Sequence, residues 1–252
     1  MNRGVLTIVD ERPAHELSAW FLMATLRQTG YSGALAVGLV NRPECRRAVA
    51  AFERLNVQVV ESQPVFEGPA ETRSQRSRKQ ALVVTPFDET VLFDRYCMAI
   101  QPINGIWAVL DQADVAMRRD LLPTVGEWRR VKGAKVPPTV PDDATNWRST
   151  VLAFRSNPFS ADFFALWQLD DTNTAAWLYD LPIARIPHEY CFLACEVVGG
   201  RPGPQMADLP EGVKVVLAYK DNMRRLARKH QPECADAVQA LALELGYAVP
   251  KF

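Results

Sequence analysis

The sequence lacks the short motifs that mark the common nucleotide-dependent and hydrolytic enzymes. It contains no Gly-x-Gly-x-x-Gly and no Gly-x-x-x-x-Gly-Lys-Ser/Thr, which argues against a dinucleotide dehydrogenase and against a P-loop enzyme. The Gly-x-Ser-x-Gly turn and the His-Glu-x-x-His motif are absent as well. A histidine-rich metal site is also excluded, because the chain has only three histidines: His15, His188 and His230.

An excess of charge and a cysteine framework are missing too. The chain holds 29 basic and 29 acidic residues, and this balance argues against a whole-protein electrostatic grip on nucleic acid or anionic lipid. Its five cysteines have no Cys-x-x-Cys spacing and are expected to be reduced thiols. No apolar run is long enough for a signal peptide or a membrane span. We therefore expect a cytoplasmic protein.

What the sequence does have is a regular alternation of apolar strand-like runs and helical segments. Hydrophobic residues make up 48% of the chain, enough to bury a substantial core. The pattern predicts strands over residues 4–10, 34–40 and 57–60, with helices over 14–29 and 41–55. Strands that alternate with helices in this way predict a parallel sheet with helices on both faces, as in nucleotide-binding proteins.

One later strand is expected to end at a carboxylate. Within residues 85–98, a turn at Pro86 leads into a short apolar run that stops at Asp94. Ligands of open α/β sheets bind beyond the carboxyl ends of the strands, so Asp94 is a candidate for a nucleotide, metal or sugar contact. The alternative is that it caps a turn. The carboxylates that could share this rim are Asp10, Asp94, Asp170, Asp171 and Glu189.

The second half of the chain continues the same pattern after an interruption. Residues 121–147 include Pro137, Pro138 and Pro141 and few periodic apolar residues, which predicts a long irregular connection. Beyond it we expect strands over 150–154, 183–186 and 213–219, an aromatic helix over 159–169, and helices in the tail. The first tail helix is basic, from Lys220 to Lys229; contact with nucleic acid is one interpretation, and a solvated surface helix is preferred.

The run from Lys79 to Asp94 resembles a stretch of the GT-A nucleotide-sugar glycosyltransferases. There, a lysine-led helix and a Ser/Thr-Pro-Phe/Tyr turn precede a strand that ends in Asp-x-Asp. Residues 6–10, 150–169 and 183–190 are similar to that family in order and spacing. The likeness covers most of residues 4–220. It implies a GT-A-like (Rossmann-like) α/β fold with a mixed, mostly parallel central sheet flanked by helices.

The resemblance also implies roles for individual residues. In that family the Asp-x-Asp holds Mn²⁺ or Mg²⁺, which neutralises the donor diphosphate, and the end of the first strand holds the base and ribose. Asp94 would be the first acid of Asp-x-Asp and a metal ligand. The catalytic carboxylate would be Asp170 or Asp171, which falls at the family's later Asp-Gln. The donor-binding residues would be Thr7, Val9, Asp10, Arg76, Lys79, Asp94, Arg95 and Tyr96.

The sequence departs from that pattern at two metal-binding positions. Tyr96 stands where the family has its second acid, and residues 217–220 replace a histidine that often follows the last strand. A hard cation prefers several oxygen ligands, so one aspartate beside a tyrosine is a poor site. Fixed cations can stabilise a leaving diphosphate instead, and the candidates are Arg76, Arg78, Lys79, Arg95 and Lys220.

Together these features predict a single domain over residues 1–252. A nucleotide-binding half (1–120) would be joined by the irregular connection (121–147) to an acceptor half with C-terminal helices (148–252). The predicted function is transfer of a sugar from a nucleoside-diphosphate sugar to an acceptor of unknown identity, without a metal. The alternatives are a catalytically inactive protein of this fold that binds a nucleotide sugar or a partner, and a transferase that acts on nucleic acid.

Overall fold

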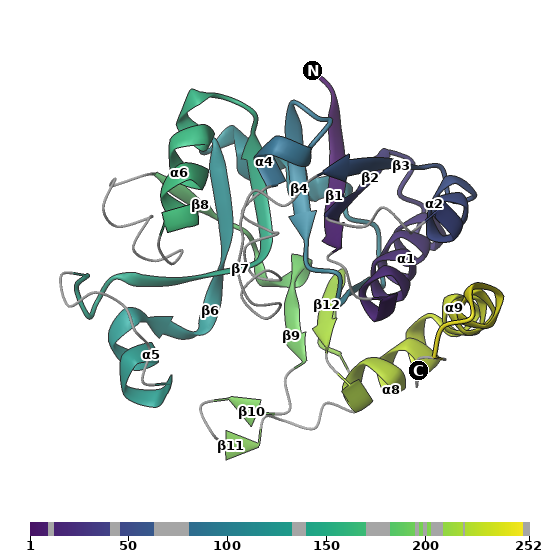
Figure 1. The fold of residues 1–252 in the computed structure, drawn as a ribbon. Coiled ribbons are helices and arrows are strands. Elements are labelled where there is room, and N and C mark those ends of the chain that lie inside the picture. Colours follow the sequence, from purple (N-terminus) through teal and green to yellow (C-terminus); the bar gives the residue numbers. More distant parts are fainter. Residues whose placement is uncertain are drawn as a thin grey trace.

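A computed structural model describes most of the chain and is drawn in Figure 1. The described residues are 1–9, 13–40, 46–62, 81–132, 140–169, 182–194, 197–198, 201–202, 209–218 and 220–248.

A seven-stranded mixed sheet forms the centre of the molecule. Its strand order is β3-β2-β1-β4-β7-β6-β8, and β3, β2, β1 and β4 run parallel to one another. β7 is antiparallel to β4 and to β6, whereas β8 is parallel to β6. The strands are β1 (Arg3–Val9), β2 (Ala34–Val40), β3 (Val57–Ser62), β4 (Glu89–Phe93), β6 (Val115–Thr124), β7 (Thr145–Arg155) and β8 (Ile183–Arg185).

Helices cover both faces of this sheet, which explains the continuous apolar runs of its parallel strands. In β1, Val5 and Val9 belong to the core with α1 (Pro13–Gln28) and α2 (Arg46–Glu53). Leu6 and Ile8 point to the opposite core, with α4 (Ala81–Val84) and α6 (Pro158–Leu169). Helices α8 (Lys220–His230) and α9 (Pro232–Leu245) extend the first core beside α1 (Figure 1).

A small second sheet lies beyond the carboxyl end of β4 (Figure 1). It has the order β5-β12-β9, and β5 follows β4 directly through a turn at residues 94–96. Its strands are β5 (Cys97–Ala99), β9 (Phe192–Ala194) and β12 (Val215–Ala218). The remaining elements are η1 (Asn104–Asp111), α5 (Val125–Lys132), η2 (His188–Tyr190), β10 (Val197–Val198) and β11 (Arg201–Pro202).

These elements confirm the predicted α/β class, the first three strands and the aromatic helix. The prediction of an irregular connection over 121–147 is wrong for the described residues, because β6 continues to Thr124 and α5 follows at once. Pro123 is tolerated in β6 because it lies at a shift in the β6–β7 register. Thr124 and Glu127 then form a reciprocal capping box: each side chain accepts the other residue's backbone N–H, at 3.2 Å in both cases.

Across the part of the chain that the structure describes, no helix combines the length and apolarity needed to cross a membrane.

Candidate functional site

Asp94 lies directly beyond β4, at the carboxyl end of the parallel strands. Its backbone N–H donates to the Thr150 carbonyl at 2.8 Å, so the β4–β7 pairing extends into the turn. The side chain is 4% exposed, and Oδ1 accepts the Tyr96 N–H at 3.0 Å. The Asp94 carbonyl also accepts the Cys97 N–H at 2.9 Å. Asp94 therefore stabilises the turn between β4 and β5 while it remains at the rim of the sheet.

Arg95 and Tyr96 pack against the start of α1. The Arg95 guanidinium lies over the Tyr96 ring, with its carbon 5.0 Å from the ring centroid, and Nη2 is 3.3 Å from His15 Nε2. His15 meets Tyr96 edge to face at 5.7 Å. Arg95 is 6% exposed. Its charge is therefore held among side chains between α1 and the turn.

The first strand contributes two buried residues to this region. Thr7 is fully buried, and its hydroxyl donates to the Phe93 carbonyl at 2.9 Å. This hydrogen bond ties β1 to the end of β4. Val9, also fully buried, packs in the core with α1. In the structure both residues hold the rim in place.

Six of the predicted site residues lie outside the described residues. They are Asp10, Arg76, Arg78, Lys79, Asp170 and Asp171. Lys220 is the first residue of α8, and its side chain is likewise outside the description. Glu189 lies in η2, where its carbonyl accepts the Lys214 N–H at 2.7 Å.

A group of buried polar residues on β6, β7 and the η2–β9 junction was missed by the sequence analysis. Arg118 donates through Nε to the Cys191 carbonyl at 3.2 Å, and Cys191 Sγ is 3.4 Å from Thr150 Oγ1. Arg118 is 7% exposed, and burial lowers its pKa. A hydrogen bond from Cys97 lowers the pKa of the Cys191 thiol. The available signal was the charged run Arg118-Arg119-Asp120 directly after the apolar start of a strand.

The described residues do not fit the metal site of the family that the sequence resembles. Asp94 uses one carboxylate oxygen within its own turn, and Tyr96 supplies no second acid. Within the described ranges, no three His, Cys, Asp or Glu side chains gather as a metal site would require. No chemical step is therefore assigned to a metal ion.

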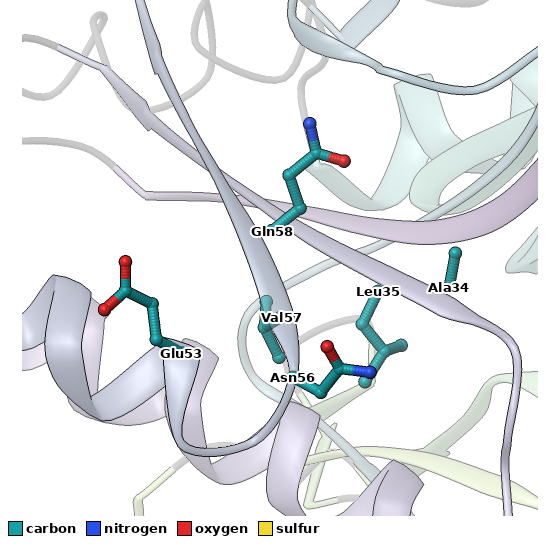
Figure 2. A pocket seen from close by; sticks show the side chains of 6 residues that line it. All are labelled: Ala34, Leu35, Glu53, Asn56, Val57 and Gln58. Atoms are coloured by element: carbon teal, nitrogen blue, oxygen red, sulfur yellow. The ribbon is translucent and has the colours of Figure 1, made fainter.

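A pocket of about 390 Å³ lies elsewhere, at the amino ends of β2 and β3 (Figure 2). Its lining combines short apolar side chains with polar ones: Ala34, Leu35, Glu53, Asn56, Val57 and Gln58. The parallel strands place this pocket at the end of the sheet opposite Asp94. Ligands of open α/β sheets bind at the carboxyl ends of the strands, so the pocket does not belong to the candidate site.

Comparison with known proteins gives similarity at the level of structure alone. No protein-family model matches the sequence. No curated protein matches it either.

Several solved structures share the fold. An active-site mutant of LgtC superposes with a TM-score of 0.62 at 10% identity, over 96% of this chain and 95% of that one. Mouse xyloside xylosyltransferase 1 gives 0.56 at 12% identity, over 88% and 99%. The glycosyltransferase GlyE of Streptococcus pneumoniae TIGR4 gives 0.59 at 10% identity, over 99% and 65%. The chain therefore has a GT-A-like fold.

Proposed function

We propose that this protein transfers a sugar from a nucleoside-diphosphate sugar to an acceptor hydroxyl. The observation that carries the proposal is the position of Asp94 at the carboxyl end of β4. The fold around it matches a glycosyltransferase structure over 96% of this chain. One of the similar proteins, LgtC, is a galactosyltransferase that has been crystallised with donor and acceptor sugar analogues. The same two substrate classes are proposed here.

In the proposed reaction the acceptor oxygen attacks the anomeric carbon of the donor sugar. A new carbon–oxygen bond forms there, the bond to the nucleoside diphosphate breaks, and the acceptor hydroxyl loses its proton. If the reaction inverts the anomeric centre, Asp170 or Asp171 is the proposed base for that proton. The end of β1, with Thr7, Val9 and Asp10, is proposed to border the nucleotide.

The leaving diphosphate requires positive charge, and we assign it to fixed cations. Arg95 is held against His15 and Tyr96, so it is a weaker candidate than the sequence alone indicated. Arg76 and Lys79, which precede α4 in the sequence, are the proposed diphosphate contacts. A preorganised cation stabilises the developing charge without a metal.

Calorimetry against UDP-, GDP-, TDP- and CMP-sugars, with Mn²⁺ and with a chelator, tests the proposal. We expect one donor to bind with the same affinity in both conditions and to be hydrolysed slowly. Absence of binding to every donor would refute the donor site. Loss of binding in chelator would refute metal independence, and tight binding without hydrolysis or transfer would instead indicate an inactive binding protein.

The Lys79→Ala variant tests the diphosphate contact. We expect donor binding to weaken by about 10- to 150-fold, because a charge-assisted hydrogen bond to phosphate contributes about 1.5–3 kcal/mol. Lys229→Ala, which removes the same charge from an exposed position on α8, is the matched control and should bind as the wild type does. Equal donor affinity in Lys79→Ala and the wild type would mean that Lys79 does not contact the donor.

A further inference from the structure

Three arginines lie near one another on the adjacent strands β7, β6 and β8. Arg118 of β6 stands directly opposite Arg148 of β7 in the strand register. On the other side of β6, Arg185 of β8 pairs with Met117, the residue before Arg118. Like charges directly opposite one another on neighbouring strands are destabilising. Compensating negative charge would therefore stabilise this arrangement.

The described residues provide only part of that compensation. Asp120 forms an ion pair with Arg148 at 3.2 Å. Arg118 forms no ion pair with a carboxylate of the described residues, and it donates instead to two backbone carbonyls, those of Cys191 and Arg119. Both Arg148 and Arg185 act on Arg118 as like charges, and among the described residues Asp120 is the carboxylate that opposes them. Counted over the described residues, positive charge is therefore in excess around Arg118, which is 7% exposed.

Within the part of the chain that the structure describes, the second acidic group beside Arg118 is the Cys191 thiol. It is fully buried, and it is engaged by Thr150 Oγ1 at 3.4 Å and by Cys97. A thiol is a weaker counter-ion than a carboxylate, because its ordinary pKa lies above neutral pH. Replacement of Cys191 therefore separates the charge compensation that the thiol provides from the compensation that a bound anion would provide.

The position of the cluster relative to Asp94 indicates which molecule would bring the anion. Asp94 hydrogen-bonds to β7 at Thr150, and Arg118 lies on the strand beyond β7. Two strand spacings amount to about 10 Å. The nucleotide is expected beyond β1 and β4, so the cluster lies past the transferred sugar, on the side from which the acceptor would approach.

We propose that Arg118, Arg148 and Arg185 bind an anionic group, a carboxylate or a phosphate, carried by the acceptor. The proposal rests on the proposed glycosyl transfer for its assignment to the acceptor. Binding of the anion itself depends only on the cluster. Arginine suits this role because its planar guanidinium can donate two parallel hydrogen bonds to a carboxylate or phosphate.

Calorimetry with D-glucuronate, inorganic phosphate and D-glucose tests the proposal at constant ionic strength and without any nucleotide sugar. We expect the two anions to bind and neutral glucose not to bind. Arg118→Met and Arg148→Gln should each weaken anion binding about tenfold, because each removes a charge-assisted contact. Arg54→Gln, which removes an exposed arginine paired with Glu244 at the far end of the sheet, is the matched control and should bind as the wild type does.

The variants are compared with the wild type by circular dichroism. Arg148→Gln, at a position whose side chain is 27% exposed, provides the test if Arg118→Met does not fold. Equal anion affinity in the wild type and in Arg148→Gln would overturn the proposal, as would failure of both anions to bind. Cys191→Ala should retain anion binding. Loss of anion binding in this variant would mean that binding depends on the thiol, which would overturn the proposal.

A second arm separates the acceptor from the donor. UDP binding should be unchanged in Arg118→Met and Arg148→Gln, since the cluster is assigned to the acceptor. A parallel loss of UDP and glucuronate affinity would assign the arginines to the donor diphosphate and overturn the acceptor assignment. If no nucleotide binds the wild type while glucuronate does, the proposed glycosyl transfer fails but the anion site stands.

Discussion

Tyr31 couples its ionisation to folding more strongly than an ordinary surface tyrosine. It follows α1 and is 3% exposed. Burial raises its pKa from 10.0 to about 12, although the nearby charge of Arg27 opposes this shift. The folded state therefore disfavours the phenolate. Below pH 10 the neutral phenol is present in both states and the folded state keeps its full stability. As the pH rises from 10 toward 12, the unfolded state ionises first and the free energy of unfolding falls.

The Tyr31→Phe variant should unfold with a weaker dependence on alkaline pH. At pH 11 the wild type should have lost about 1 kcal/mol of unfolding free energy through Tyr31, and the variant should not show this part of the loss. Urea unfolding in reducing buffer at pH 8 and pH 11 measures the difference. Cys234, with a pKa raised to about 11 by burial, titrates in both proteins and cancels from the comparison. Identical pH dependence in the two proteins would contradict the assignment.

At the scale of single elements, α6 shows how an aromatic stripe attaches a helix to a sheet. Phe163, Phe164 and Trp167 recur on one side of the helix, and each is at most 4% exposed. Phe164 packs against Phe154 of β7 with ring centroids 4.9 Å apart. The stripe is therefore core packing, the interpretation that its helical spacing favours.

Phe163→Ala should destabilise the protein by about 3–5 kcal/mol, because it removes a fully buried ring and leaves a cavity. Urea denaturation followed by far-UV circular dichroism measures the change. Leu243→Ala on α9 is the control: that side chain is 70% exposed, so its truncation should change stability by less than about 0.5 kcal/mol. Equal effects of the two substitutions would mean that α6 does not bury its aromatic face.

At the scale of the whole molecule, one hydrophobic core runs from the C-terminal helices to the central sheet. It includes Val238 and Leu241 of α9, Leu22 of α1 and Val91 of β4. Polar contacts reinforce the connection between α1 and the tail: the Tyr247 hydroxyl donates to Glu16 at 2.8 Å, and Gln28 donates to Glu233 at 3.0 Å. The two halves predicted from the sequence therefore share packed surfaces.

The shared core leads us to expect one cooperative unfolding transition for the chain. Tryptophan fluorescence and far-UV circular dichroism should give the same midpoint in urea, since tryptophans lie in both predicted halves and in the connection between them. Two separate midpoints would indicate two independently folding domains and would contradict the single-domain prediction.

The sequence by itself determined the elements whose signals are local. Apolar runs flanked by helical periodicity were sufficient to predict β1, α1 and β2. The start of α5 was missed although Thr124 and Glu127 have the capping-box spacing, because the prolines that follow predicted an irregular connection. The resemblance around residues 79–94 was sufficient for the GT-A-like fold. In each case, neighbouring residues in the chain carry the information.

Only the tertiary structure decided which polar side chains meet. Arg95 contacts His15, which is 80 residues away, and Arg118 contacts Cys191, which is 73 residues away. The cluster of arginines exists because β6 lies between β7 and β8, a strand order that local periodicity does not encode. A hydrogen bond or a charge pair depends on distances of a few ångströms between side chains, and only the packed sheet sets those distances.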